Sequence, residues 1–183
     1  MARARMLVVL LVGVLLATTG AILVAGQAQA TQGFCGISWG SLPKTAEPYS
    51  QNPLTNIRTG RDRCWDRMVL DVNGPAAGYD VRYVDSVHAD GSGRLIPLNG
   101  GAKLQVVLKA PAYDQTFQST YSGIVGQKLP GVNLAGYQTF RDAKFAGSFE
   151  GQTTIGLGIR ARLPFRVFKL DNRVVLDVAH FWS

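Results

Sequence analysis

DRMVLDVNG at residues 66–74 and NRVVLDVAH at residues 172–180 are nearly the same sequence, with five of nine positions identical. In both stretches apolar residues alternate with other residues, which is the period of a β-strand and not of a helix. Each stretch therefore predicts a strand with one apolar face toward a core. The residues on these two faces are Met68, Leu70 and Val72 in the first stretch and Val174, Leu176 and Val178 in the second.

The charges of the repeat also predict how the two strands pair. Within one strand, an Arg and an Asp four residues apart are separated by about 13 Å, which is too far for an ion pair. Across an antiparallel pair, two complementary ion pairs would flank a valine contact, each contributing about 0.2–1 kcal/mol. The predicted partners are Arg67 with Asp177, Val69 with Val175, and Asp71 with Arg173. In the alternative arrangement, the two copies lie in opposite sheets.

The same alternation recurs in most of the chain after residue 66. It is found in GYDVRYV at 78–84, AKLQVVLKA at 102–110, TTIGLGIRARL at 153–163 and PFRVFKL at 164–170. Asn-Gly, Asp-Gly and Asp-Asn pairs separate the runs, and such pairs tolerate the positive φ of tight turns. Residues 110–144 lack a clear period and predict a long connection. At least six half-polar strands, with no long amphipathic helix, predict an all-β fold, an antiparallel sandwich or barrel.

The first 30 residues are predicted to be a leader and not part of the fold. MARAR is a short cationic start, an apolar run follows, and AQA at 28–30 provides the small residues of a cleavage site. This is the layout of a secretory signal peptide cleaved near Ala30. The alternative is an uncleaved anchor, because the apolar run approaches the roughly 20 residues that span a bilayer. We therefore expect a secreted or cell-envelope protein that contacts the membrane only through an uncleaved leader.

Two cysteines, Cys35 and Cys64, remain in the exported part of the chain. An even count in an oxidising compartment predicts one disulfide. Residues 31–60 are rich in Pro, Ser, Gly and Asn and predict an irregular arm tethered by that disulfide, followed by the folded domain at 61–183. The exported chain carries a net charge of +5, because the leader removes two arginines from the total of +7. Its basic residues are scattered, and nucleic acid is not an expected partner outside the cell.

Few titratable groups are placed for catalysis. His88 lies between Asp85 and Asp90 in a glycine-rich turn, without a recognised metal-ligand spacing. His180 continues the inward face of the second repeat strand and is predicted to be a hydrogen-bonded histidine at the rim of the core. No Gly-x-Ser-x-Gly, no His-Glu-x-x-His and no free catalytic thiol occurs. We therefore expect a non-catalytic protein without a metal or another cofactor.

A binding face is predicted on the outward side of residues 154–162. It offers Thr154, two glycines that allow close approach, and then Arg160 and Arg162, which pair well with carboxylates or phosphates. Tyr121 and Tyr137, in the irregular middle of the chain, are candidates for stacking on sugar rings. The alternatives are that the glycines mark a crowded corner of the fold and that the aromatic side chains pack in the core.

Two long stretches resemble the AMIN-like domain of exported proteins from high-GC Gram-positive bacteria. They are CWDRMVLDVNGPAAGYDVRYVDSVHADGSGRLIPLNGGAKLQVVLKAPA and AGSFEGQTTIGLGIRARLPFRVFKLDNRVVLDVAHFW, and the resemblance covers residues 61–183. The related AMIN domain is a β-sandwich of two similar sheets that targets cell-wall amidases to peptidoglycan or the septum. The resemblance implies an antiparallel β-sandwich of two similar sheets that binds peptidoglycan or another cell-envelope glycopolymer, with the cell wall or an envelope protein as its partner. The alternative function is an envelope lipid carrier or a protein-interaction domain.

Overall fold

The structure is a computed structural model that describes residues 34–182. The chain divides into two units, Met1–Thr31 and Gln32–Ser183, and every described residue belongs to the second unit. The predicted signal peptide at residues 1–30 therefore lies outside the described residues, and its cleavage stays a prediction. Among residues 34–182, the one helical element is the short 3-10 helix η1 (Phe34–Gly36), and no helix has the length and apolarity to cross a membrane.

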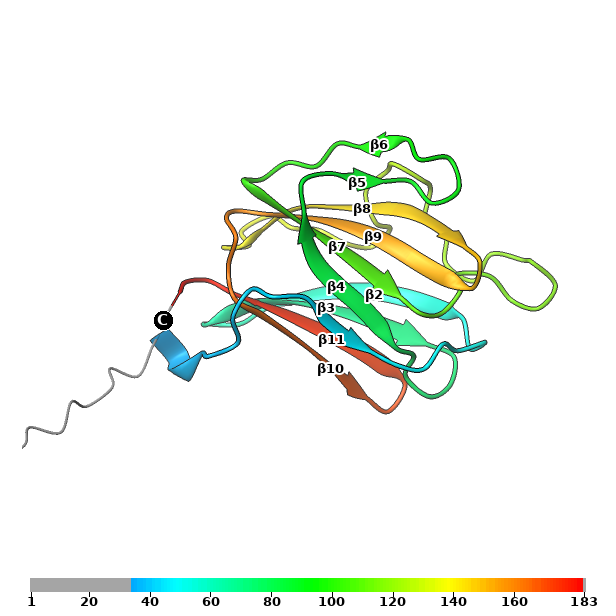
Figure 1. Ribbon diagram of the computed structural model, residues 1–183, viewed down its shortest axis with the longest axis horizontal. Helices are drawn as coiled ribbons and strands as arrows, with labels where there is room; N and C mark the ends of the chain where they lie inside the picture. Colours follow the sequence, from blue (N-terminus) through cyan, green and yellow to red (C-terminus); the bar gives the residue numbers. More distant parts are fainter. Residues whose placement is uncertain (1–33, 183) are drawn as a thin grey trace, which may run out of the picture. The chain divides into compact units, whose positions relative to one another are not determined.

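The described chain forms two antiparallel sheets that pack face to face (Figure 1). The first sheet contains, in order, β1 (Lys44–Ala46), β4 (Tyr79–Val84), β7 (Ala102–Leu108), β9 (Gln152–Ile159) and β8 (Phe140–Phe149). The second contains β10 (Phe165–Leu170), β11 (Arg173–Ala179), β3 (Trp65–Val72) and β2 (Leu54–Arg61). A short hairpin, β5 (Val87–His88) with β6 (Leu95–Ile96), lies outside the first sheet (Figure 1). The predicted antiparallel β-sandwich is thus confirmed.

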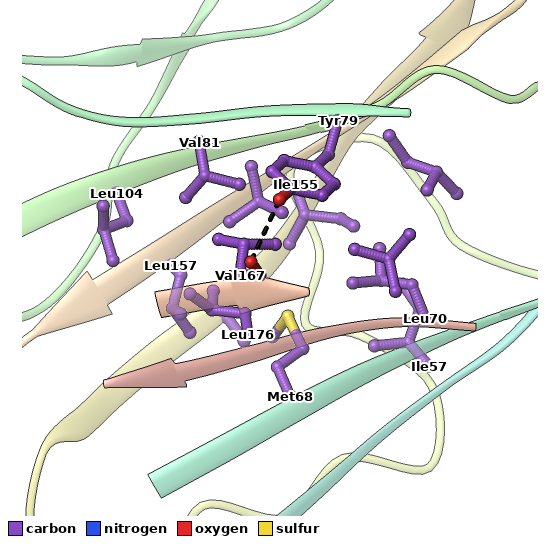
Figure 2. Packing of buried hydrophobic residues seen from close by; sticks show 14 of the residues in the cluster. Ile57, Met68, Leu70, Tyr79, Val81, Leu104, Ile155, Leu157, Val167 and Leu176 are labelled. Atoms are coloured by element: carbon purple, nitrogen blue, oxygen red, sulfur yellow. Dashed lines mark hydrogen bonds between the residues drawn. The ribbon is translucent and has the colours of Figure 1, made fainter. Parts of the chain in front are cut away.

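The apolar faces of the two sheets fill the space between them, and their side chains interdigitate (Figure 2). All six residues that the repeat assigned to the core are buried, namely Met68, Leu70, Val72, Val174, Leu176 and Val178. The Tyr79 hydroxyl lies in this core and donates to the carbonyl oxygen of Val167 at 3.0 Å, which joins the two sheets (Figure 2). A buried hydroxyl without such a partner would be costly.

The two copies of the repeat are neighbours in the second sheet. β3 and β11 pair antiparallel in the predicted register, with Arg67 opposite Asp177, Val69 opposite Val175, and Asp71 opposite Arg173. The first predicted ion pair is formed, because Arg67 Nε lies 2.6 Å from Asp177 Oδ1. The pairing of like strands is therefore confirmed, and the alternative of opposite sheets is excluded.

The second predicted ion pair has a different partner. Asp71 is bound by Arg58 of β2 at 2.8 Å, and Arg173 donates to its neighbour Asn172 instead. Asp177 receives a second arginine, Arg166 of β10, at 2.9 Å. Each aspartate of the repeat thus forms an ion pair with an arginine of the strand that flanks the β3–β11 pair on its side. Aligning the two repeat strands alone does not reveal these flanking partners.

The disulfide between Cys35 and Cys64 is present as predicted. The segment that it encloses is less irregular than expected, because it supplies β1 and β2 to the two sheets, so the sandwich begins before residue 61. A bulge between Leu54 and Asn56 interrupts the alternation in β2. Two further bulges interrupt the alternation in β8, which lies partly in the predicted connection at 110–144. Bulges place two residues opposite one and thereby obscure the period of a strand.

The turns of the sandwich gather at two opposite ends (Figure 1). One end holds the β2–β3 and β9–β10 turns, the start of β8 and the segment after β11, where the C-terminus is marked in Figure 1. The other end holds the β3–β4, β8–β9 and β10–β11 turns and the segment after β7. Part of the β7–β8 connection, drawn in yellow-green, projects beyond the sheets there (Figure 1).

Candidate functional site

The outward face of β9, predicted as a binding face, is covered by the chain itself. Thr154 is 1% exposed and lies beside Asp90, whose carboxyl pKa is raised by burial. A Cβ on Gly156 would meet Leu98 Cδ1 at 2.9 Å, and one on Gly158 would overlap the carbonyl oxygen of Asn99. Gly158 therefore admits the backbone of another segment and Gly156 admits the side chains of Leu98 and Val87, as in the alternative of a crowded corner. Thr154 lies on the predicted face, but it is not open to a ligand.

Arg160 and Arg162 lie beyond this covered face, in the β9–β10 turn, and both are exposed. Arg160 donates to the carbonyl oxygens of Gln138 and His180, the first at 3.2 Å. Arg162 donates to the hydroxyl and the carbonyl oxygen of Ser41 at 3.1 and 3.2 Å. Binding of a ligand by these two arginines stays a prediction, and their guanidinium groups already order the loops around them.

The two predicted tyrosines lie in different places. Tyr137 stacks on the buried Phe140 with ring centres 5.9 Å apart, and its hydroxyl donates to Thr59 Oγ1 at 2.9 Å, so it is bound within the fold. Tyr121 is buried against Phe145 at the other end of the sandwich, and burial raises the pKa of its hydroxyl to about 12. That hydroxyl has no hydrogen-bond partner within residues 34–182. Arg160, Arg162, Thr154, Tyr121 and Tyr137 are therefore not brought together at one site.

The two histidines occupy structural positions. His88 is exposed, with Nε2 at 2.8 Å from Ser86 Oγ and Nδ1 at 2.8 Å from the Gly93 carbonyl oxygen. His180 is buried at the rim of the core, where Nδ1 lies 2.9 Å from Thr139 Oγ1 and Nε2 lies 3.1 Å from the Asp62 carbonyl oxygen, as predicted. Within residues 34–182, no group of three or more His, Cys, Asp or Glu side chains is arranged to hold a metal ion.

Four exposed and half-exposed aromatic side chains, which we call the aromatic tip, lie around the β8–β9 turn. Its members are Tyr49, Tyr113, Phe117 and Phe149. The Tyr113 hydroxyl accepts a hydrogen bond from the Gly151 amide at 3.1 Å, and the Tyr49 hydroxyl donates to Gln152 at 3.4 Å. Both tyrosines are therefore held against the turn that follows Phe149.

Phe117 is the most exposed member of the aromatic tip, at 81%. Its ring stacks on that of Tyr113, with centres 5.7 Å apart and planes inclined by 26°. Its backbone has a φ of 60°, a left-handed conformation that is strained for any residue other than glycine. Strain of this kind persists where surrounding contacts impose it, and it is frequent at functional sites. The fold thus holds a large apolar ring in water, in a conformation that costs free energy.

Asp114 supplies the contacts that impose this conformation. Its Oδ1 accepts hydrogen bonds from the amides of Thr116 and Gln118 at 2.8 and 3.0 Å, and from the Thr116 hydroxyl at 2.6 Å. Donors of this kind stabilise the charged carboxylate, so they hold its pKa below the usual value for Asp. The turn around Phe117 is therefore closed by one aspartate on the loop itself.

Three hollows surround the Phe117 loop. One, of about 470 Å³, is lined by Tyr113 and Phe117 together with Gln51, Asp114, Gln115 and Glu150. The next, of about 320 Å³, shares both rings and continues to Tyr121 and Phe145. The third, of about 490 Å³, shares Tyr121 and is lined by the polar residues Thr55, Asn56, Ser119 and Ser122 together with Pro130 and Gly131. Each hollow shares lining residues with the next, so the three hollows are neighbours along this part of the surface.

Sequence patterns do not reveal this site. Tyr49, Tyr113, Phe117 and Phe149 are spread over 101 residues, and no period or motif connects them. The local signal is DQT at 114–116, an Asp placed two residues before a Thr, which favours a side-chain-closed turn. Such a turn followed by a phenylalanine predicts an exposed ring. It does not predict which residues surround that ring.

Comparison with known proteins identifies the family of this sandwich. A model of the AMIN-like domain family matches residues 52–180, which is most of the chain and most of the described fold. No curated protein and no solved structure matches the chain. AMIN-like domains are binding domains of the cell-wall-targeting type, typical of the cell envelope. The chain therefore belongs to the AMIN-like domain family, as its repeat strands and closing motif suggested.

Proposed function

We propose that this domain binds a glycopolymer of the cell envelope, such as peptidoglycan, through the aromatic tip. The observation that carries the proposal is the Phe117 ring, which is exposed and stacked on Tyr113 above two hollows. Flat aromatic faces pack against the apolar C–H faces of sugar rings, and they bury a large area for few lost degrees of freedom. An exposed ring held in a strained backbone conformation is hard to explain by folding stability.

The polar groups beside the rings fit the hydroxyl and amide groups of a polysaccharide. Gln51, Gln115 and Gln152 lie at or beside the aromatic tip, and each side chain can both donate and accept hydrogen bonds. Each hollow lies within the roughly 300–1,000 Å³ range of ligand sites. Three neighbouring hollows favour a polymer over a single sugar, because successive rings can occupy successive hollows.

The charges around the aromatic tip also restrict the class of polymer that can bind there. Asp114 and Glu150 line the same hollow, and no Lys or Arg of residues 34–182 lines any of the three hollows. Lys109, which lies over the Tyr49 ring, is paired with Glu47. Two carboxylates disfavour a polyanion by like-charge repulsion. We therefore expect neutral or amino sugars as the preferred units of the bound polymer.

A pull-down on purified cell wall tests the proposal, using the chain from Gln32 onward with its disulfide intact. Phe117→Ala should reduce retention by about tenfold or more, as expected for removal of a central aromatic anchor. Leu170→Ala removes an exposed apolar side chain elsewhere and is the matched control, with retention unchanged.

The arginine pair predicted from the sequence is the competing site in the same assay. Loss of retention on Arg160→Ala with Arg162→Ala, while Phe117→Ala is retained normally, would move the site to the other end of the sandwich. Absence of retention by the unsubstituted chain would remove the proposed function.

A further inference from the structure

The end of the sandwich opposite the aromatic tip is rich in arginine. We call it the basic end, and its cationic residues are Arg61, Arg63, Arg141, Arg160 and Arg162. They come from the end of β2, the β2–β3 turn, the start of β8 and the β9–β10 turn. Among the ion pairs of residues 34–182, none involves any of these five arginines. Asp62, in the β2–β3 turn, directs one carboxylate oxygen to the amide of Cys64.

Neutral acceptors hold four of the five guanidinium groups in place, those of Arg61, Arg141, Arg160 and Arg162. Arg160 and Arg141 both donate to the Gln138 carbonyl oxygen, at 3.2 and 2.9 Å. Arg61 donates to the Gly136 carbonyl oxygen at 3.2 Å, and Arg162 donates to Ser41. A backbone carbonyl orients a guanidinium without cancelling its charge. These side chains are therefore positioned cations that remain available to an anionic surface.

Exposed apolar side chains accompany these arginines. Leu42 is 72% exposed and follows Ser41, the residue that Arg162 contacts. Trp182 is 54% exposed, and its Nε1 donates to the Arg162 carbonyl oxygen at 2.8 Å. Phe181, next to it, lies under the Arg160 guanidinium at 5.5 Å from ring centre to Cζ. A tryptophan with its N–H bonded and its ring exposed, beside arginines, suits the boundary between lipid headgroups and acyl chains.

The start of the described chain lies at the same end. Cys35 is joined to Cys64 in the β2–β3 turn, with Cα atoms 6.0 Å apart. The residues that precede Phe34, including the apolar run predicted to be a leader or anchor, therefore join the domain at the basic end. A bilayer is the surface on which such a run acts before cleavage, or remains if uncleaved.

From these observations we propose that the basic end docks on the surface of a bilayer that contains anionic lipids. The arginines meet the lipid phosphates, and Leu42 and Trp182 enter the interface, as in other peripheral binding surfaces that combine charge with apolar burial. A dissolved polyanion would satisfy the arginines but would leave Leu42 in water. Because the aromatic tip lies at the opposite end, a domain docked in this way directs its glycan-binding site away from the membrane.

Vesicle flotation tests the docking, with residues 32–183, which form one unit containing the core and the disulfide. Vesicles of phosphatidylcholine and phosphatidylglycerol in equal parts should carry the protein, and vesicles of phosphatidylcholine alone should not. Arg63→Gln should weaken partitioning by about fivefold, the effect of one arginine near an anionic surface. Arg173→Gln removes the same charge near the opposite end and should leave partitioning nearly unchanged.

A second pair of variants separates the membrane from a dissolved polymer. Leu42→Ser with Trp182→Ser should weaken partitioning onto the anionic vesicles without changing binding to soluble polyphosphate. Equal effects of Arg63→Gln and Arg173→Gln would show that partitioning depends only on net charge, and would overturn the proposed docking surface. No vesicle binding, or vesicle binding unaffected by the Leu42 and Trp182 changes, would also overturn it. Retention on cell wall reports on the aromatic tip, so the two proposals fail separately.

Discussion

The two ends of the sandwich each use one aspartate to hold a loop, and the two aspartates differ in burial. At the basic end, Asp66 is fully buried, and its Oδ2 accepts the amides of Thr139 and Phe140 at 2.6 and 3.0 Å. At the aromatic tip, Asp114 lies at the surface and accepts the amides of its own loop. One aspartate therefore fastens its loop to the core, and the other fastens its loop to itself.

This difference suits the two proposed roles. A docking surface of several fixed arginines needs loops that keep their mutual positions, and the buried network of Asp66, Thr139 and His180 joins three of them. A loop that presents an aromatic ring to a polymer needs freedom to adjust to successive sugars. Loops held mainly by hydrogen bonds near the surface open more easily than loops anchored in the core, so the aromatic tip should be the more mobile end.

The largest expected effect comes from Asp66→Ala. It would leave two buried amides without an acceptor, and we expect a loss of about 3–4 kcal/mol in the free energy of unfolding. Urea unfolding followed by circular dichroism measures this loss. Asp114→Ala is the matched change at the other end and should cost far less. Similar losses for the two variants would show that both loops are fastened equally, and would remove the contrast between the ends.

A pair of largely buried tyrosines gives the next largest effect. The Tyr83 hydroxyl at the basic end donates to the Leu163 carbonyl oxygen and accepts from the Leu163 amide, both at 2.8 Å, whereas the Tyr121 hydroxyl has no partner within residues 34–182. Tyr83→Phe should therefore destabilise the fold by about 1–2 kcal/mol, and Tyr121→Phe should be neutral or slightly stabilising. A destabilising Tyr121→Phe would reveal a partner at the aromatic tip and weaken the contrast.

The same tyrosines predict behaviour in alkali. Burial raises the pKa of both Tyr83 and Tyr121 to about 12, above the usual value of 10. A raised pKa means that the unfolded chain loses the proton first, so this contribution to stability is complete below about pH 10 and is lost as the pH rises toward 12. Burial also raises the pKa of Tyr79, so ultraviolet titration of phenolate should show Tyr79, Tyr83 and Tyr121 ionising late, and one late-ionising tyrosine fewer in each Phe variant.

The architecture followed from the sequence where the strand period was intact. β3 and β11 alternate without interruption, so their register and the Arg67–Asp177 pair could be predicted from their residues alone. β8 could not be predicted, because its two bulges shift the alternation partway along the strand. The predicted ion pair between Asp71 and Arg173 was wrong for a related reason. The actual partner, Arg58, belongs to strand β2, which the alternation of residues did not reveal.

Sites were harder to predict than strands. Arg160 and Arg162 were correctly expected to lie outside the core, but the apolar residues beside them come from the two ends of the described chain, Leu42 and Trp182. The alternation placed Thr154 on the correct face of β9. Nothing in the sequence of that strand predicts that the backbone of Asn99 covers this face at Gly158. The residues that lie beside a site and come from distant loops are brought there by the folded sandwich. They leave no local pattern in the sequence.

A smaller effect on stability is expected from Phe117→Gly at the aromatic tip. A left-handed backbone costs a residue with a Cβ roughly 1–2 kcal/mol, and glycine would release that strain. About half of the released free energy is offset, because a glycine makes the unfolded chain more flexible and so stabilises it. We therefore expect a net stabilisation of about 0.5–1 kcal/mol in urea, together with loss of retention on cell wall. Phe117→Ala keeps the strain and should lose retention without the gain. Loss of stability in Phe117→Gly would show that the ring serves the fold.

The smallest effect concerns the pH dependence of the loop that Asp114 closes. Its hydrogen bonds from Thr116 and Gln118 favour the charged carboxylate and lower its pKa. A lowered pKa contributes stability that is present above the unfolded pKa of Asp, near 4, and is lost as the pH falls through the lower folded value. The protection factors of the amides of residues 115–118, taken relative to the intrinsic exchange rate at each pH, should therefore fall in acid before those of the core do. Asp114→Asn should remove that acid sensitivity while leaving the amides around Asp66 protected. Protection factors that fall together at both ends would mean that the aromatic tip opens only when the whole sandwich unfolds. The loop would then be as firmly held as the basic end, and its adjustment to successive sugars would have to come from side chains alone.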